Sequence, residues 1–161
     1  MNKRVLSAAA TISLLAIPAT LFAAPASKFL GDAIKGDNSE MTLGALAAKR
    51  GASSEVRAFG RMLQVDHAKA KTSAVVAARR ERVSVSSGMM PEASAEFSKL
   101  QHLSGRAFDR EFARYMVEDH QKDIAEFRKQ ERTGDRVTAL LARQTLPHLR
   151  KHLATAQGIR T

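Results

Sequence analysis

A pattern of thirteen residues occurs twice in this chain, and it limits the folds that the chain can adopt. Residues 57–69 read RAFGRMLQVDHAK, and residues 110–122 read REFARYMVEDHQK. Six of the thirteen aligned positions are identical, and they include the pairs Asp66/Asp119 and His67/His120. A repeated segment with helical spacing of its apolar residues is typical of two similar helices in one bundle. The repeat therefore predicts an aspartate and a histidine at equivalent positions on two helices.

Apolar residues at helical spacing continue through most of the chain, and alternating runs typical of strands are absent. The spacing predicts long helices over about 27–50, 54–82 and 106–132, and a fourth after Asp135. Pro91 suits the start of a short helix between the second and third long helices, and Pro147 is expected to bend or split the fourth. These elements predict an all-α fold, an antiparallel four-helix bundle with one short extra helix.

The first 26 residues have the pattern of an export signal. Lys3 and Arg4 form a basic start, an apolar stretch follows, and Ala24-Pro25-Ala26 supplies small residues at the cleavage position. Cleavage near residue 26 is expected to leave one domain, residues 27–161, in the periplasm. The chain has no cysteine, so neither a lipoprotein nor a disulfide is expected. An uncleaved anchor at the membrane surface is the alternative.

The formal net charge is +10, and it becomes +8 without residues 1–26, which contain Lys3 and Arg4 but no acidic residue. A strongly basic chain often binds nucleic acid. Export instead makes anionic envelope components, such as lipid headgroups or lipopolysaccharide, the expected partners. Nucleic acid is not expected, because the sequence has no aromatic-rich basic face and no phosphate-binding glycine loop. A soluble protein without a specific ligand remains the alternative.

Each long helix is expected to direct at least one carboxylate or imidazole toward the centre of the bundle. These residues lie on the same helical stripes as the apolar side chains, three or four positions apart. Imidazole and carboxylate together suit Fe, Mn, Zn or Cu, and helix bundles build such sites in their cores. The candidate ligands of a single metal ion are Glu40, His67, His120, His148 and His152, with His152 as an alternate ligand or a group that supports one.

Asp66 and Asp119 are expected to hydrogen-bond the ligating imidazoles rather than bind the metal, because each points about 100° away from its neighbouring histidine. A purely structural interpretation is also open here. Each aspartate would then accept a hydrogen bond from an imidazole on a neighbouring helix, and these polar pairs would fix the register of the bundle. His102 is expected at the surface. No catalytic motif is recognisable, so the sequence leaves enzymatic activity undecided.

Several motifs, taken in order, resemble the bacterial domain-of-unknown-function family 4142. The resemblance covers nearly all of residues 28–158. The matching segments are Glu40-Met41-Thr42-Leu43-Gly44-Ala45-Leu46-Ala47, the helix Val56…Phe59…Met62…Asp66-His67, Leu103-Ser104-Gly105-Arg106-Ala107-Phe108-Asp109, Met116-Val117-Glu118-Asp119-His120 and Leu146-Pro147-His148-Leu149…His152-Leu153. The resemblance implies an exported protein with a ferritin-like four-helix fold, and it implies no established activity.

The chain departs from the usual di-iron proteins of that fold, which place Glu-x-x-His on two helices. The residues three before the candidate histidines are Gln64, Val117, Thr145 and Leu149. None is glutamate, so a ferroxidase of the usual type is not expected. The first functional hypothesis is therefore an exported protein that binds one metal ion and acts in envelope stress. The second is a non-enzymatic envelope interaction module with a basic surface and a structural Asp-His core.

Overall fold

The computed structural model describes residues 20–85 and 87–160, and their side chains from Ala26 onward. Five helices make up nearly all of this part of the chain, and it contains no strand. Their bounds are α1 Thr20–Arg50, α2 Ser54–Arg80, α3 Pro91–Gln101, α4 Gly105–Thr133 and α5 Arg136–Gly158. The prediction of an all-α fold with a short helix between the second and third long helices is confirmed.

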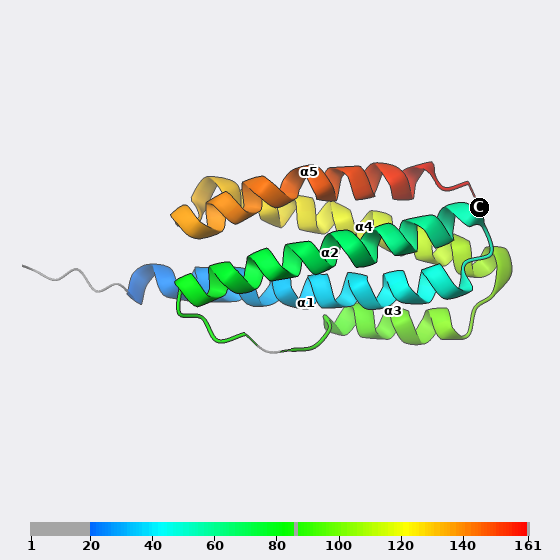
Figure 1. Ribbon diagram of the computed structural model, residues 1–161, viewed down its shortest axis with the longest axis horizontal. Coiled ribbons are helices and arrows are strands. Elements are labelled where there is room, and N and C mark those ends of the chain that lie inside the picture. Colours follow the sequence, from blue (N-terminus) through cyan, green and yellow to red (C-terminus); the bar gives the residue numbers. More distant parts are fainter. Residues whose placement is uncertain (1–19, 86, 161) are drawn as a thin grey trace, which may run out of the picture.

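The four long helices lie lengthwise beside one another, and α3 lies against one end of α1 (Figure 1). The closest packing joins α1 to α2 and α4 to α5, and these two pairs meet mainly where α2 packs against α5. Helices α2 and α4, which carry the sequence repeat, are not among the closely packed pairs. They therefore face each other across the centre of the bundle, where their buried side chains meet.

Side-chain caps fix where the helices begin. The Ser53 hydroxyl accepts a hydrogen bond from the Val56 amide at the start of α2, and the Asp135 carboxylate accepts from the Val137 and Thr138 amides at the start of α5. The buried carboxylate of Asp109 on α4 accepts from the backbone amides of Ala52 and Ser53, each at 2.8 Å. This pair of bonds ties the α1–α2 turn to the first turn of α4.

Two glycines allow α1 and α2 to approach closely. A Cβ atom on Gly60 would lie 2.5 Å from the Gly44 carbonyl oxygen and 2.6 Å from the Ala48 amide nitrogen. A Cβ on Gly44 would lie 2.7 Å from the Gly60 carbonyl oxygen. Backbone thus packs directly on backbone at this level, and no larger residue fits at either position without moving a helix.

The apolar core fills the two ends of the bundle and leaves its middle polar. Phe59, Phe108, Phe112 and Met116 form the centre of the cluster toward the α1–α2 turn. Smaller clusters at the other end are centred on Leu30 with Ile34, Ala77 and Leu141, and on Ile124 with Phe127, Leu146 and Leu149. The polar residues described below lie between these layers.

Pro147 does not split α5, which continues through it. Pro147 and Arg143, whose carbonyl loses its helical donor, are both exposed, so water can satisfy that carbonyl.

Most of the expected export signal lies at residues 1–19, outside the described residues, and its cleavage stays a prediction. None of the helices in the described part combines the length and hydrophobicity needed to cross a bilayer.

We predict that Gly60→Ala lowers the free energy of unfolding by about 1–3 kcal/mol, because the new methyl group meets backbone rather than a flexible side chain. Gly31→Ala is the matched control, since Gly31 is also inside a helix and a Cβ there has no neighbour within 4 Å. The free energy of unfolding of this control should rise by about 0.5–1 kcal/mol. Urea denaturation measures both, and equal effects of the two substitutions would contradict the close packing.

Candidate metal centre

One polar side chain from each long helix meets the others in the middle of the bundle. Glu40 comes from α1, His67 from α2, His120 from α4 and His152 from α5, and none exposes more than 3% of its surface. The ring centroid of His152 lies 5.1 Å from that of His67 and 5.4 Å from that of His120. Each histidine offers one ring nitrogen that lies within 4.8 Å of those offered by the other two.

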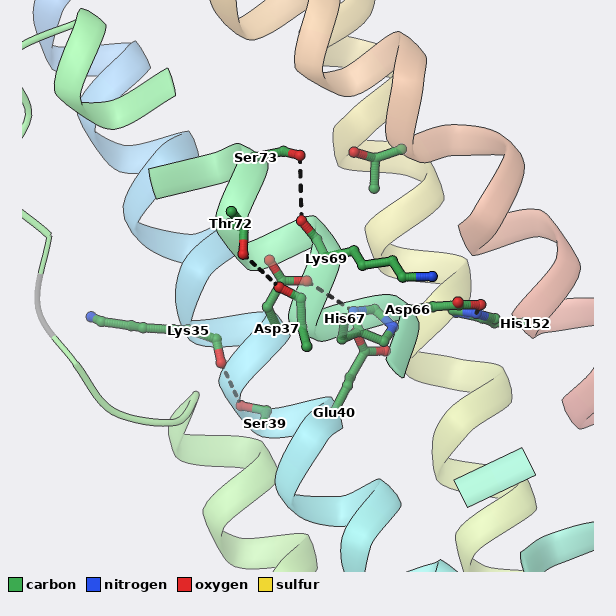
Figure 2. A network of polar contacts seen from close by, with 12 residues as sticks. Lys35, Asp37, Ser39, Glu40, Asp66, His67, Lys69, Thr72, Ser73 and His152 are labelled. Carbon is green, nitrogen blue, oxygen red and sulfur yellow. Dashed lines mark hydrogen bonds and ion pairs between the residues drawn. The ribbon is translucent and has the colours of Figure 1, made fainter. Parts of the chain in front are cut away.

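A hydrogen bond to a nearby group holds one ring nitrogen of every histidine in this cluster. His120 Nδ1 donates to the Met116 carbonyl oxygen at 2.9 Å, and His152 Nε2 lies 3.0 Å from the Asp66 carboxylate. His67 Nδ1 lies 2.9 Å from Asp37 Oδ1 and 2.8 Å from Glu40 Oε2. Figure 2 shows the Asp37, Glu40 and His67 side chains together, with Asp66 beside His152. These bonds fix the orientation of all three rings.

The remaining ring nitrogens have no hydrogen-bond partner. His67 Nε2, His120 Nε2 and His152 Nδ1 are buried and unpaired, and so is Glu40 Oε1. His120 Nε2 lies 3.1 Å from Glu40 Oε1, but the angles do not make a hydrogen bond. Four buried polar atoms without partners in one cluster are costly unless something binds them. A transition-metal ion fits this donor set, because it accepts neutral imidazole nitrogens and a carboxylate oxygen.

Opposite charges surround His67. Burial acts to lower the pKa of its imidazole, but Glu40 and Asp37 raise it to about 10. Burial likewise acts to raise the pKa of Glu40, but the charge of His67 and its contact with the carboxylate lower it to about 2. His67 is therefore an imidazolium ion paired with two carboxylates, and a metal ion that binds its Nε2 must first displace the proton there.

The other two histidines are neutral. Burial lowers the pKa of His120. Burial also lowers the pKa of His152 to about 4, with the positive His67 adding to the effect and the Asp66 hydrogen bond opposing it. Because the Met116 carbonyl oxygen can only accept, the proton of His120 is on Nδ1 and the lone pair of Nε2 is free. The same reasoning leaves the lone pair of His152 Nδ1 free, since Nε2 donates to Asp66.

The structure changes the ranking of the two candidate histidines on α5. His152 joins the buried cluster, whereas His148 is exposed and lines a smaller pocket between α2 and α5 of about 200 Å³. Residues four apart on a helix differ by about 40° in direction, and α5 is rotated so that Leu149, His152 and Ala156 face inward. The sequence pattern predicted His148 as a ligand, with His152 as an alternate. The structure instead places His152 in the cluster and His148 outside it.

The two aspartates of the repeat lie in different surroundings. Asp66 is hydrogen-bonded to the outer nitrogen of His152 on the neighbouring helix, in the supporting position expected for it. Asp119 lies closer to the ligand set than expected, because one of its oxygens is within 4.8 Å of Glu40 and His120. Burial, with Glu40 next in effect, raises the pKa of Asp119 to about 9. His102 is exposed, as expected.

Sequence reasoning missed two carboxylates of this region. Asp37 pairs with His67, and Asp123 lies in the cleft described below, where burial raises its pKa to about 8. Both had a signal in the sequence. Asp37 is four residues after Ala33 and three before Glu40, on the stripe that was already predicted to face inward. Asp123 is likewise one helical turn after Asp119.

A cleft of about 750 Å³ reaches the cluster from the side where α1 faces α4. Glu40 and His67 form part of its wall, together with Asp37, Asp119 and Asp123. It extends to Met90 before α3 and to Gly134 between α4 and α5. The cleft therefore reaches Glu40 and His67 at the edge of the cluster, whereas His120 and His152 are not part of its wall.

Comparisons with known proteins agree with this structure. A family model, described as "Domain of unknown function (DUF4142)", matches residues 15–159. The chain belongs to the DUF4142 family. Among solved structures, a DUF305 fragment from Deinococcus radiodurans is similar, with a TM-score of 0.74 and 20% sequence identity over 84% of this chain and 94% of that one. At this identity the likeness shows the fold alone. No curated protein matches the chain.

We predict that His67→Leu, measured with chelator present, lowers the free energy of unfolding by about 3–5 kcal/mol at pH 7, because it leaves Asp37 and Glu40 buried without a cation. Adding Glu40→Gln to this variant should restore part of the loss. His102→Leu is the control at an exposed histidine and should change stability by less than about 0.5 kcal/mol. Similar small effects of His67→Leu and His102→Leu in urea denaturation would disprove the ion pair.

Proposed function

We propose that this protein binds a transition-metal ion through His67, His120 and His152, with Glu40 beside them. The observation that supports the proposal is the convergence of three imidazoles whose outer nitrogens are each hydrogen-bonded and whose inner nitrogens are buried and unpaired. Metal-binding histidines are typically held in this way, with the second ring nitrogen bonded to a carboxylate or carbonyl oxygen.

The donor set defines the class of metal. Three nitrogen atoms and one carboxylate oxygen suit Zn, Cu, Fe or Mn, and do not suit Ca or Mg. Bound Zn acts as a Lewis acid, whereas bound Cu or Fe can also exchange electrons. The residues present hold the ion and orient the rings toward it. The cleft beside Glu40 leaves room for a small molecule to approach.

The test compares two histidines of α5 that are four residues apart. We expect the untagged full chain to bind about one Zn²⁺ ion at the histidines, and His152→Ala to lose at least tenfold in affinity. Replacing a residue that only hydrogen-bonds a ligand already lowers metal affinity about 10–100-fold at such sites. His148→Ala should bind like the wild type, because His148 is exposed and outside the cluster. Isothermal titration with Zn²⁺, Cu²⁺, Mn²⁺ and Fe²⁺ measures the affinities.

Two results would refute the proposal. One is the absence of metal uptake by the wild type under all four titrations. The other is equal uptake by the wild type and His152→Ala. Circular dichroism shows whether each variant keeps its helices, so that loss of binding is not confused with loss of fold.

We further propose that this function operates in the bacterial envelope, in a stress-related role, after export and cleavage near residue 26. The basic start, apolar stretch and small residues of the first 26 positions support export. The prediction is that protein recovered from the periplasm lacks Met1 to Ala26, which intact-mass measurement checks. Recovery of the uncleaved chain from the membrane fraction would contradict it.

A further inference from the structure

Acidic side chains are concentrated in the cleft where α1 faces α4. Eight of the chain's 16 Asp and Glu residues line it, against three of its 26 Lys and Arg residues. The eight include Asp37 and Glu40 of α1, and Asp119 and Asp123 of α4. The cleft is therefore rich in carboxyl groups inside a chain whose net charge is +10. A narrow, low-dielectric cleft of one sign concentrates ions of the opposite sign.

The carboxylates at the deep end of this cleft have no cationic partner. Asp119 and Asp123 are one turn apart on α4, hence on one face of the helix. No Lys, Arg or His side chain among the described residues forms an ion pair or hydrogen bond with either of them. Of the three lysines that line the cleft, Lys28 is paired with Asp32 near its outer part. Asp119 instead lies beside Glu40.

The second carboxylate oxygen of Glu40, which also belongs to the unpaired atoms of the histidine cluster, is the second observation. Glu40 is 1% exposed, and its Oε2 is engaged with His67 Nδ1. Its Oε1 has no hydrogen-bond partner, and the residue offers a ligand atom within 4.8 Å of one from Asp119. A buried, unpartnered carboxylate oxygen next to another unpartnered carboxylate requires a shared proton or a cation between them. A separation of at most 4.8 Å between a Glu40 oxygen and an Asp119 oxygen is in the range spanned by two ligands of one ion.

We propose that Glu40, Asp119 and Asp123 form a second cation position on the cleft side of the histidines, and that it takes a divalent ion that prefers oxygen ligands. Mn²⁺ and Mg²⁺ have that preference. The inference rests on the metal-binding function proposed above, because Glu40 lies between the two positions. Its Oε2 lies 2.8 Å from His67 Nδ1, and its Oε1, which has no hydrogen-bond partner, lies 3.1 Å from His120 Nε2.

Two metals that differ in ligand preference separate the two positions experimentally. The full chain receives one equivalent of Zn²⁺, which the imidazoles favour over Mn²⁺ by the usual order of divalent-metal affinities. Mn²⁺ is then added, unbound metal is removed by dialysis, and both metals per chain are measured by mass spectrometry. We expect one Zn and one Mn in the wild type, and one Zn with a loss of more than 90% of the Mn in Asp119→Asn/Asp123→Asn.

Asp32→Asn/Glu126→Gln is the matched control. It removes two charges from the same cleft at positions other than the three proposed ligands. This control should keep one Zn and one Mn, with a Mn affinity lowered less than tenfold by the weaker field. Retention of Zn by every variant shows that the bundle is intact.

The outcomes distinguish the two proposals. One Zn without Mn in the wild type, or one Mn in Asp119→Asn/Asp123→Asn, overturns the second position and leaves the histidine site standing. Equal loss of Mn in both double variants also overturns it, since diffuse attraction by the cleft would then explain the binding. Absence of both metals from the wild type overturns both proposals. Mn lost only from Asp119→Asn/Asp123→Asn supports the second position.

Discussion

The ion pair between His67 and the carboxylates of Asp37 and Glu40 is the interaction on which the rest of the structure depends. Three ionisable groups are buried in the middle of a bundle, where an unpaired charge costs several kcal/mol. They are tolerable only if α1 and α2 keep one register. The backbone contact of Gly44 with Gly60 sets the distance between these helices, and the ion pair sets their relative position along the axis.

This close packing of α1 on α2 also explains the shape of the site. Helices α1 and α2 form one tight pair, and α4 and α5 form another. The pairs meet well between α2 and α5 but poorly between α1 and α4, so the cleft opens on that side. His67 lines this cleft together with several carboxylates, among them Glu40, Asp119 and Asp123.

The sequence repeat has a simple structural meaning. Its two copies lie on α2 and α4, which face each other across the bundle and direct His67 and His120 to one point. The symmetry ends at the adjacent aspartates, because Asp66 contacts α5 and Asp119 faces α1. The same pair of residues thus supports an imidazole on one side and adds a carboxylate on the other. Membership of DUF4142 assigns no activity, so the geometry of this cluster carries the functional proposal.

The sequence by itself determined the helices, their order, and the inward positions of Glu40, His67 and His120. Helical spacing is a local property, and these residues are on stripes whose other members are plainly apolar. Asp37 was on the same stripe and was predictable on the same grounds. Only the tertiary structure decided between His148 and His152, because their directions differ by about 40° and the rotation of α5 depends on its packing against α2 and α4. It also decided which aspartate supports an imidazole and which faces the cleft, since residues adjacent in sequence acquire different partners only when the helices pack.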